Sequence, residues 1–134
     1  MYKWSVGLRE AQIGVPYARS IVDCYTPDTL LKPGIDHPFF SKQLLANPSS
    51  ACWDLLSNTI YLGVLAWSPS IILHECAHAV DIRLGISIHG DFGAHDPIFL
   101  DKWCELMIDY GLFQPAELRD SLSSYGLSFE GVTR

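Results

Sequence analysis

The chain has 134 residues, of which 49% are hydrophobic and 18% charged, and its net charge is −6. That length and composition are typical of a single domain spanning residues 1–134 and exclude an intrinsically disordered chain. Residues 68–134 carry ten acidic and four basic side chains, against five of each in residues 1–67. Because nucleic-acid binding depends on clustered lysine and arginine, we expect no nucleic-acid partner.

The amino-terminal residues lack the apolar core of a signal peptide. Residues 60–80 are apolar enough to suggest a membrane span, but Pro69 and ionisable side chains interrupt them, and no other segment approaches the ~20 apolar residues required. We therefore expect a soluble, cytoplasmic protein without membrane contact. Four cysteines occur without any C-x-x-C pair, which argues against a zinc ribbon and a redox motif. Because there is no signal-peptide pattern, we expect buried free thiols and not disulfides. These are Cys24, Cys52, Cys76 and Cys104.

The first 45 residues carry weak structural signals. Residues 17–25 form an amphipathic stretch that periodicity leaves open between helix and strand. Pro27-Asp28, Lys32-Pro33-Gly34 and His37-Pro38 indicate turns or loops. Phe39–Leu45 is expected to form a short helix. His37 is interpreted as a turn or surface histidine.

Two strands are predicted next, Ala51–Leu56 and Thr59–Val64. Ser57-Asn58 between them is typical of a two-residue hairpin loop. The open edge of this hairpin could hold an extended peptide by strand addition. A purely structural hairpin that covers the core is the alternative.

A helix is predicted from Pro69 to Leu84, with Ser68 before it and Gly85 after it as typical end signals. It contains His74-Glu75-Cys76-Ala77-His78, the pattern H-E-x-x-H. Residues four apart share one helix face, so both imidazoles can bind one ion, and two such ligands form half of a tetrahedral zinc site. Glu75 can reach a water on the open side of that ion, which suits a general base.

The remaining chain is predicted to be helical in two segments. Residues 86–94 read as a loop, and Asp96-Pro97 opens a helix that runs to Tyr110 and stops at Gly111. A last helix spans Pro115–Tyr125 and is closed by Gly126. The apolar stripe of the first helix is expected to be core and not a cofactor contact. It consists of Phe99, Trp103, Leu106 and Met107.

A catalytic zinc needs a third protein ligand. A metzincin would have a histidine at position 84, which is leucine, and Glu105 is the glutamate available for a thermolysin-like site. We favour His95, because it stands directly before the start of a helix that would hold its ring. The downstream candidates are His89, Asp91, His95, Asp96, Asp101 and Glu105.

The pattern His74-Glu75-x-x-His78, sixteen residues, then His95-x-x-x-Phe99 with Trp103 following, resembles the minimal zinc metalloproteases of the SprT-like and WLM type. It is also similar to small metallopeptidases of phages and mobile elements. The resemblance implies a small zincin-like α+β domain, in which a β-hairpin or short sheet packs on the metal helix and two helices follow. It also implies Zn2+ as cofactor and a polypeptide as substrate.

Two departures limit this resemblance. Asp96 replaces the glycine that often follows the third histidine, and the carboxyl-terminal cysteine cluster by which SprT-like relatives bind DNA is absent. We therefore carry over the hydrolytic core and not a role in DNA repair.

The expected reaction is peptide hydrolysis, in which Glu75 takes a proton from a zinc-activated water and delivers it to the leaving amine. Tyr61, Tyr110 and His89 are candidate oxyanion donors, and Asp81 and Asp96 are candidate acceptors for the imidazole N–H groups.

Two alternatives use the same motif. Peptide deformylase takes its third ligand from a Glu-Gly-Cys-Leu segment, whereas Cys52 lies in Ser-Ala-Cys-Trp. The other alternative is a non-catalytic module in which a metal staples a protein-binding domain. Retention of Glu75 argues against that module, because a structural metal site has no use for a base. The sequence leaves the oligomeric state open.

Overall fold

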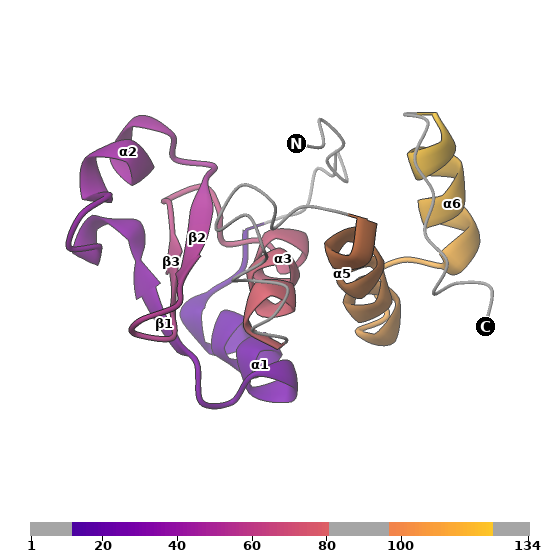
Figure 1. The fold of residues 1–134 in the computed structure, drawn as a ribbon, viewed down its shortest axis with the longest axis horizontal. Coiled ribbons are helices and arrows are strands. Elements are labelled where there is room, and N and C mark those ends of the chain that lie inside the picture. Colours follow the sequence, from indigo (N-terminus) through magenta and orange to yellow (C-terminus); the bar gives the residue numbers. More distant parts are fainter. Residues whose placement is uncertain (1–11, 81–96, 125–134) are drawn as a thin grey trace.

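The computed structural model describes residues 12–80 and 97–124. This part of the chain is an α+β arrangement of five α-helices and one three-stranded sheet, as predicted for the fold class (Figure 1). Its elements are α1 (Val15–Tyr25), β1 (Leu30–Pro33), the 3-10 helix η1 (Gly34–Asp36), α2 (Ser41–Ala46), β2 (Ala51–Asp54), β3 (Thr59–Leu62), α3 (Pro69–Val80), α5 (Pro97–Asp109) and α6 (Pro115–Ser123). Within the described ranges, none of the helices is long and apolar enough to cross a membrane.

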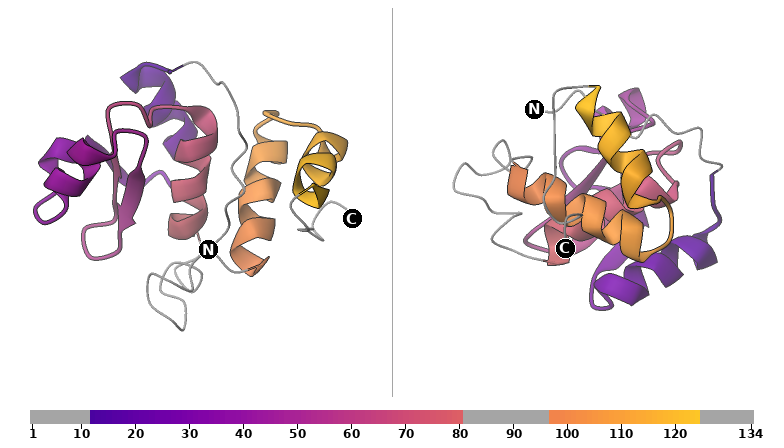
Figure 2. Two further views of the ribbon diagram at one scale, coloured as in Figure 1. Left: turned by 90° about the horizontal axis from the view of Figure 1, so that it is seen from above. Right: turned by 90° about the vertical axis from the view of Figure 1, so that its right-hand side faces the viewer.

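The elements are stacked in layers with α3 near the middle (Figures 1 and 2). The strands lie in the order β1-β3-β2, with β1 parallel and β2 antiparallel to β3. Helices α1 and α3 pack together and α3 also contacts β2, while α2 lies on the far side of the sheet. On its other side α3 packs against α5, and α6 lies beyond α5. Helix α3 is therefore enclosed between the sheet and the carboxyl-terminal helices.

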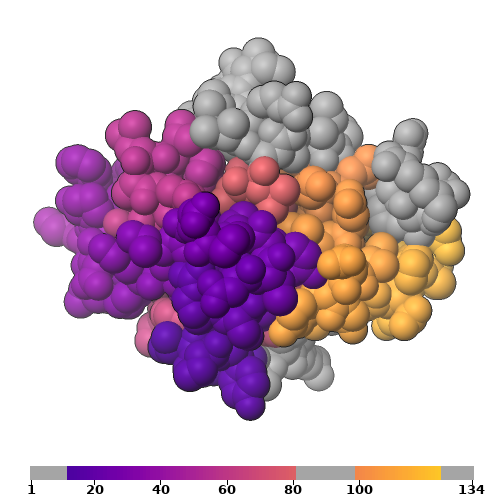
Figure 3. Space-filling model, turned by 90° about the horizontal axis from the view of Figure 1, so that it is seen from below, coloured from indigo at the N-terminus to yellow at the C-terminus, as the bar shows by residue number. Residues whose placement is uncertain are grey.

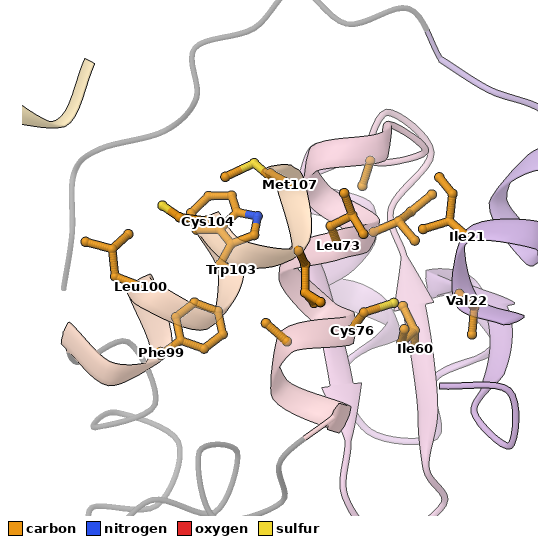
Figure 4. Packing of buried hydrophobic residues seen from close by; sticks show 14 of the residues in the cluster. Ile21, Val22, Ile60, Leu73, Cys76, Phe99, Leu100, Trp103, Cys104 and Met107 are labelled. Atoms are coloured by element: carbon orange, nitrogen blue, oxygen red, sulfur yellow. The ribbon is translucent and has the colours of Figure 1, made fainter. Parts of the chain in front are cut away.

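Helix α3 begins at Pro69, as predicted, and the Ile72 N–H donates to the Ser68 carbonyl at 3.0 Å. Its predicted end at Leu84 and Gly85 lies outside the described residues. The side of α3 that carries Leu73 and Cys76 packs toward Ile60 of the sheet, as Figure 4 shows. These side chains are fully buried, which explains why the helix is apolar on most of its surface.

The hairpin is present, but its strands are shorter than predicted. Strand β2 ends at Asp54 and β3 begins at Thr59, so four residues and not two connect them. Strand β3 ends at Leu62, two residues before the predicted end. The Asp54 carboxylate explains the wider turn, because it accepts hydrogen bonds from the Leu56 N–H at 3.2 Å and the Ser57 hydroxyl at 2.7 Å. Asn58 closes the turn with a φ of 48°, a left-handed conformation that asparagine tolerates.

The amino-terminal part resolves one alternative and corrects one prediction. Residues 17–25, which the sequence leaves open between helix and strand, are helical within α1. Lys32 and Pro33, predicted to lie in a turn or loop, belong to edge strand β1. Pro33 ends that strand, where a missing N–H does not interrupt the sheet. Helix α2 begins at Ser41, two residues later than predicted.

His37 lies in a turn, as predicted, but it is buried and not on the surface. Its Nδ1 atom accepts hydrogen bonds from the backbone N–H groups of Phe39 and Phe40, at 3.0 and 2.9 Å. Its ring packs on Tyr61 with the ring centroids 4.5 Å apart. Strand β3 therefore covers a histidine that the local sequence places at the surface.

The carboxyl-terminal helices follow the predicted order. Helix α5 ends at Asp109, and Gly111 has the positive φ of 84° that is typical of a glycine after a helix. Helix α6 ends at Ser123, two residues before the predicted end at Tyr125. All four cysteines are free, as predicted. Only two are buried, since Cys24 is exposed and Cys52 half-buried.

Candidate metal centre

His74 and His78 lie one turn apart on α3, with their ring centroids 5.1 Å apart. Two imidazoles that share one zinc ion at about 2.0–2.1 Å with a tetrahedral angle have ring centres roughly 5 Å apart. The separation of the two rings and the chemistry of their nitrogens therefore fit a shared zinc ion. The His78 side chain is buried, whereas the His74 side chain is 22% exposed.

Glu75 lies between the two histidines in sequence, and its carboxyl group is almost fully buried. Its Oε2 atom is 3.7 Å from Nε2 of His74. Burial raises the pKa of this carboxyl from the ordinary 4.5 to about 8, because a charge costs free energy where water is excluded. A cation beside His74 would favour the carboxylate and oppose that shift.

Two aromatic side chains of α5 contact the imidazoles. Phe99 stacks on His78 with a centroid distance of 4.2 Å and an interplanar angle of 19°, and it meets the His74 ring edge-on at 4.8 Å. Trp103 also meets the His74 ring edge-on, at 4.6 Å. Both aromatic residues belong to the core, as predicted. Their contacts with the histidine rings were not predicted from the sequence.

The origin of this contact is a matched spacing on two packed helices. His74 and His78 are four residues apart on α3, and Phe99 and Trp103 are four residues apart on α5. The later residue of one pair meets the earlier residue of the other, so the helices run antiparallel where they pack. The equal spacing of the two pairs was the signal in the sequence that could have indicated the contact.

The predicted third ligand lies outside the described residues. His95, which we predict as this ligand, and the alternatives His89, Asp91 and Asp96 are among residues 81–96. Residues 12–80 and 97–124 contain no group of three His, Cys, Asp or Glu side chains that could hold a metal. The described alternatives therefore do not complete the site with both histidines; these are Asp101, Glu105 and Cys52.

The described residues also bear on the candidate oxyanion donors. Tyr110 follows the carboxyl-terminal end of α5, eleven residues after Phe99, which is about 16 Å along a helix axis. Tyr61 is buried on β3 against His37. The histidine rings contact α5 at Phe99 and Trp103, and Tyr110 lies seven residues beyond Trp103. A role for Tyr110 or Tyr61 as oxyanion donor stays a prediction. His89 and the predicted acceptors Asp81 and Asp96 lie outside the described residues.

On the face that Figure 3 shows, α1 covers the centre of the molecule and only a small area of α3 is visible. A separate apolar groove of about 260 Å³ lies where β1 and β3 end and where η1 and α2 pack. Its lining includes Ile35, Leu45 and Val64 but no residue of α3.

Comparison of the chain with protein-family models, with curated proteins and with solved structures finds no match.

Proposed function

We propose that the chain is a zinc-dependent metallopeptidase with a small zincin-like domain. In this proposal His74, His78 and His95 bind the zinc ion and Glu75 is the general base. The observation that carries the proposal is the arrangement on α3, where two imidazoles lie 5.1 Å apart and a buried carboxyl oxygen lies 3.7 Å from one of them. The resemblance of about residues 68–107 to the SprT-like and WLM pattern supports the same conclusion.

A bound zinc ion would supply an activated water and polarise the peptide carbonyl group. Glu75 would accept a proton from that water and donate it to the nitrogen of the departing amine. Its position suits this role, because the carboxyl is buried beside His74, where a bound cation would favour the carboxylate form that accepts the proton. The buried aromatic rings of Phe99 and Trp103 exclude water from the side of the imidazoles that they cover.

The substrate in this proposal is an extended polypeptide. Strand β2 is an edge strand of the described sheet and contacts α3. An extended segment could add to the free side of β2 through main-chain hydrogen bonds, which would bring a peptide bond close to the helix that carries Glu75. The acidic excess of residues 68–134 favours neutral or cationic segments over acidic ones.

The test is a pair of matched substitutions, Glu75→Gln and Glu105→Gln. Glu105 is a glutamate on α5 whose side chain is 57% exposed. Zinc content and hydrolysis of an unfolded polypeptide are measured for both variants and the wild type. We expect Glu75→Gln to retain zinc and to lose at least about 100-fold in rate, since an amide cannot accept the proton. Glu105→Gln should keep both properties.

The alternative is a non-catalytic domain in which the same histidines hold a structural metal. The exposed apolar groove beside η1 and α2 favours this reading, because such grooves are common at protein-binding sites. It predicts that wild type and Glu75→Gln bind zinc equally and that neither hydrolyses any of a panel of unfolded polypeptides. Hydrolysis at equal rates in the wild type and in Glu75→Gln would show that Glu75 is not the general base.

A further inference from the structure

Trp103 is tied to the same turn of α3 that carries His74. Its indole N–H donates a hydrogen bond to the Ser70 carbonyl at 3.0 Å, and its ring meets the His74 ring at 4.6 Å with an interplanar angle of 82°. Ser70 lies four residues before His74, so its carbonyl is also the acceptor that the helix provides for the His74 N–H. The Ser70 carbonyl thus connects the Trp103 indole to the turn of backbone that ends at His74.

The indole has little freedom to move. Trp103 is 7% exposed and belongs to the main hydrophobic cluster, in which Met107 of the same helix and Leu73 of α3 are also buried (Figure 4). A buried tryptophan that is both packed and hydrogen-bonded keeps one orientation. Its ring therefore forms a fixed surface against which the His74 imidazole rests.

The two imidazoles differ in how they are held. The His78 ring is buried and stacks face to face on Phe99. The His74 side chain is 22% exposed, and its ring has edge-on contacts with Phe99 and Trp103. The second side-chain torsion of histidine is broad, so an exposed imidazole samples several orientations unless a neighbour restricts it. The contacts of Trp103 and Phe99 therefore restrict the orientation of the less buried of the two rings.

We infer that Trp103 is a positioning residue, which holds the His74 imidazole in the orientation that binds zinc. This inference rests on the proposed function, because it assumes that His74 is a ligand. A ligand that is already oriented loses less conformational entropy when the ion binds, so a fixed neighbour increases affinity without touching the ion. The contribution should be close to that of one aromatic pair, which corresponds to about a two- to tenfold change in affinity.

The experiment compares the same substitution at two tryptophans. Trp103→Phe removes the hydrogen bond to Ser70. Trp53→Phe removes a matching bond, since the Trp53 indole N–H donates to Oδ1 of Asn58 at 2.9 Å. Among the ring contacts of the described residues, those of His74 and His78 do not include Trp53. The dissociation constant for zinc is measured by competition with a chromophoric chelator, and the visible spectrum is recorded with Co2+ in place of zinc.

We expect Trp103→Phe, which loses the hydrogen bond that fixes the indole, to bind zinc about two- to tenfold more weakly than the wild type. It should also shift the Co2+ absorption bands, which respond to ligand geometry. Trp103→Leu, which also removes the aromatic ring, should show a larger loss. Trp53→Phe should leave both measurements unchanged, even if it lowers the melting temperature of the zinc-free protein as much as Trp103→Phe does. A loss of stability alone would not change the spectrum.

Three results would overturn the inference. If the wild type binds zinc and Trp103→Phe binds it equally well with the same spectrum, Trp103 is only a core residue and the proposed function stands. Equal weakening by Trp53→Phe would lead to the same conclusion. If the wild type itself binds no zinc, the proposed function fails and the inference fails with it.

Discussion

His37 lies in the turn before α2, where its Nδ1 atom accepts hydrogen bonds from two backbone N–H groups. His74 and His78 instead lie on α3 with a buried carboxyl beside them and aromatic rings of α5 against them. The first arrangement gives a buried polar ring a partner from the backbone, which stabilises the fold. The second brings three ionisable side chains together on one turn of a helix, two of them buried and one 22% exposed.

Buried polar groups of the sheet region have their hydrogen-bond partners within the fold. In the sheet region, Asn58 resembles His37, because its side-chain oxygen accepts hydrogen bonds from the Thr29 hydroxyl and the Trp53 indole, both at 2.9 Å. These groups need no further ligand. On α3, a metal ion would instead interact with both imidazoles and the carboxyl at once, and its binding to the folded chain would add to the stability of the fold.

The largest expected effect follows from replacing a proposed ligand. His74→Ala or His78→Ala should abolish stoichiometric zinc binding and the rise in melting temperature that zinc causes, because binding to the folded state is folding free energy. His37→Asn, which keeps an acceptor in the turn, should bind zinc like the wild type. Zinc content by elemental analysis and thermal unfolding with and without zinc measure both effects. Full zinc content in both alanine variants would show that His74 and His78 are not zinc ligands.

The second effect concerns the pH dependence of the zinc-free protein. The Glu75 carboxyl keeps its proton up to a pH of about 8 in the folded chain, whereas the unfolded chain loses it near 4.5. Between these values the folded state binds more protons, so the free energy of unfolding should fall as the pH rises, by up to roughly 1.4 kcal/mol per pH unit. Above pH 8 this contribution should stop changing.

Glu75→Gln provides the control for this pH dependence, because the amide does not titrate. Unfolding by urea in the presence of a chelator, between pH 5 and pH 8.5, should show a weaker decline for the variant than for the wild type. Parallel curves for the two proteins would mean that Glu75 carries a charge in the folded chain at neutral pH. The thiols of Cys52, Cys76 and Cys104, whose pKa values burial raises to about 12, titrate above this range.

The parts of the fold that the sequence predicted well depend on local signals. Helix α3 begins at Pro69 because Ser68 and the proline define a helix start, and α5 ends before Gly111 because glycine accepts a positive φ. The spacing of His74 and His78 placed both rings on one face without any knowledge of the tertiary structure. These features need only the neighbouring residues.

The parts that the sequence did not predict depend on contacts between distant segments. Strand β1 has four residues and contains Pro33, so it has no local strand pattern, and it forms because it pairs with β3. His37 is buried because Tyr61 lies against it. The contacts of Phe99 and Trp103 with the histidines require the antiparallel packing of α5 on α3, which no residue in either helix indicates alone.

The third prediction concerns Asn58, which accepts two hydrogen bonds at the end of the hairpin turn. Asn58→Ala removes the acceptor of two hydrogen bonds and leaves a less tolerant residue at a φ of 48°. We expect a loss of about 1–3 kcal/mol in the free energy of unfolding, because the Thr29 and Trp53 donors lose their partner. Zinc affinity should not change. A simultaneous loss of zinc binding would show that the hairpin turn and α3 are coupled.

The smallest expected effect concerns His37 itself. His37→Ala removes the acceptor of the Phe39 and Phe40 N–H groups, which resembles the loss of a helix cap and should cost about 1 kcal/mol. His37→Asn places an oxygen near the position of Nδ1 and should recover part of that loss. Urea unfolding of the two variants measures the difference. If alanine and asparagine are equally destabilising, packing of the ring on Tyr61 and not its hydrogen bonding holds this histidine, and it would then resemble the α3 histidines, whose neighbours are aromatic.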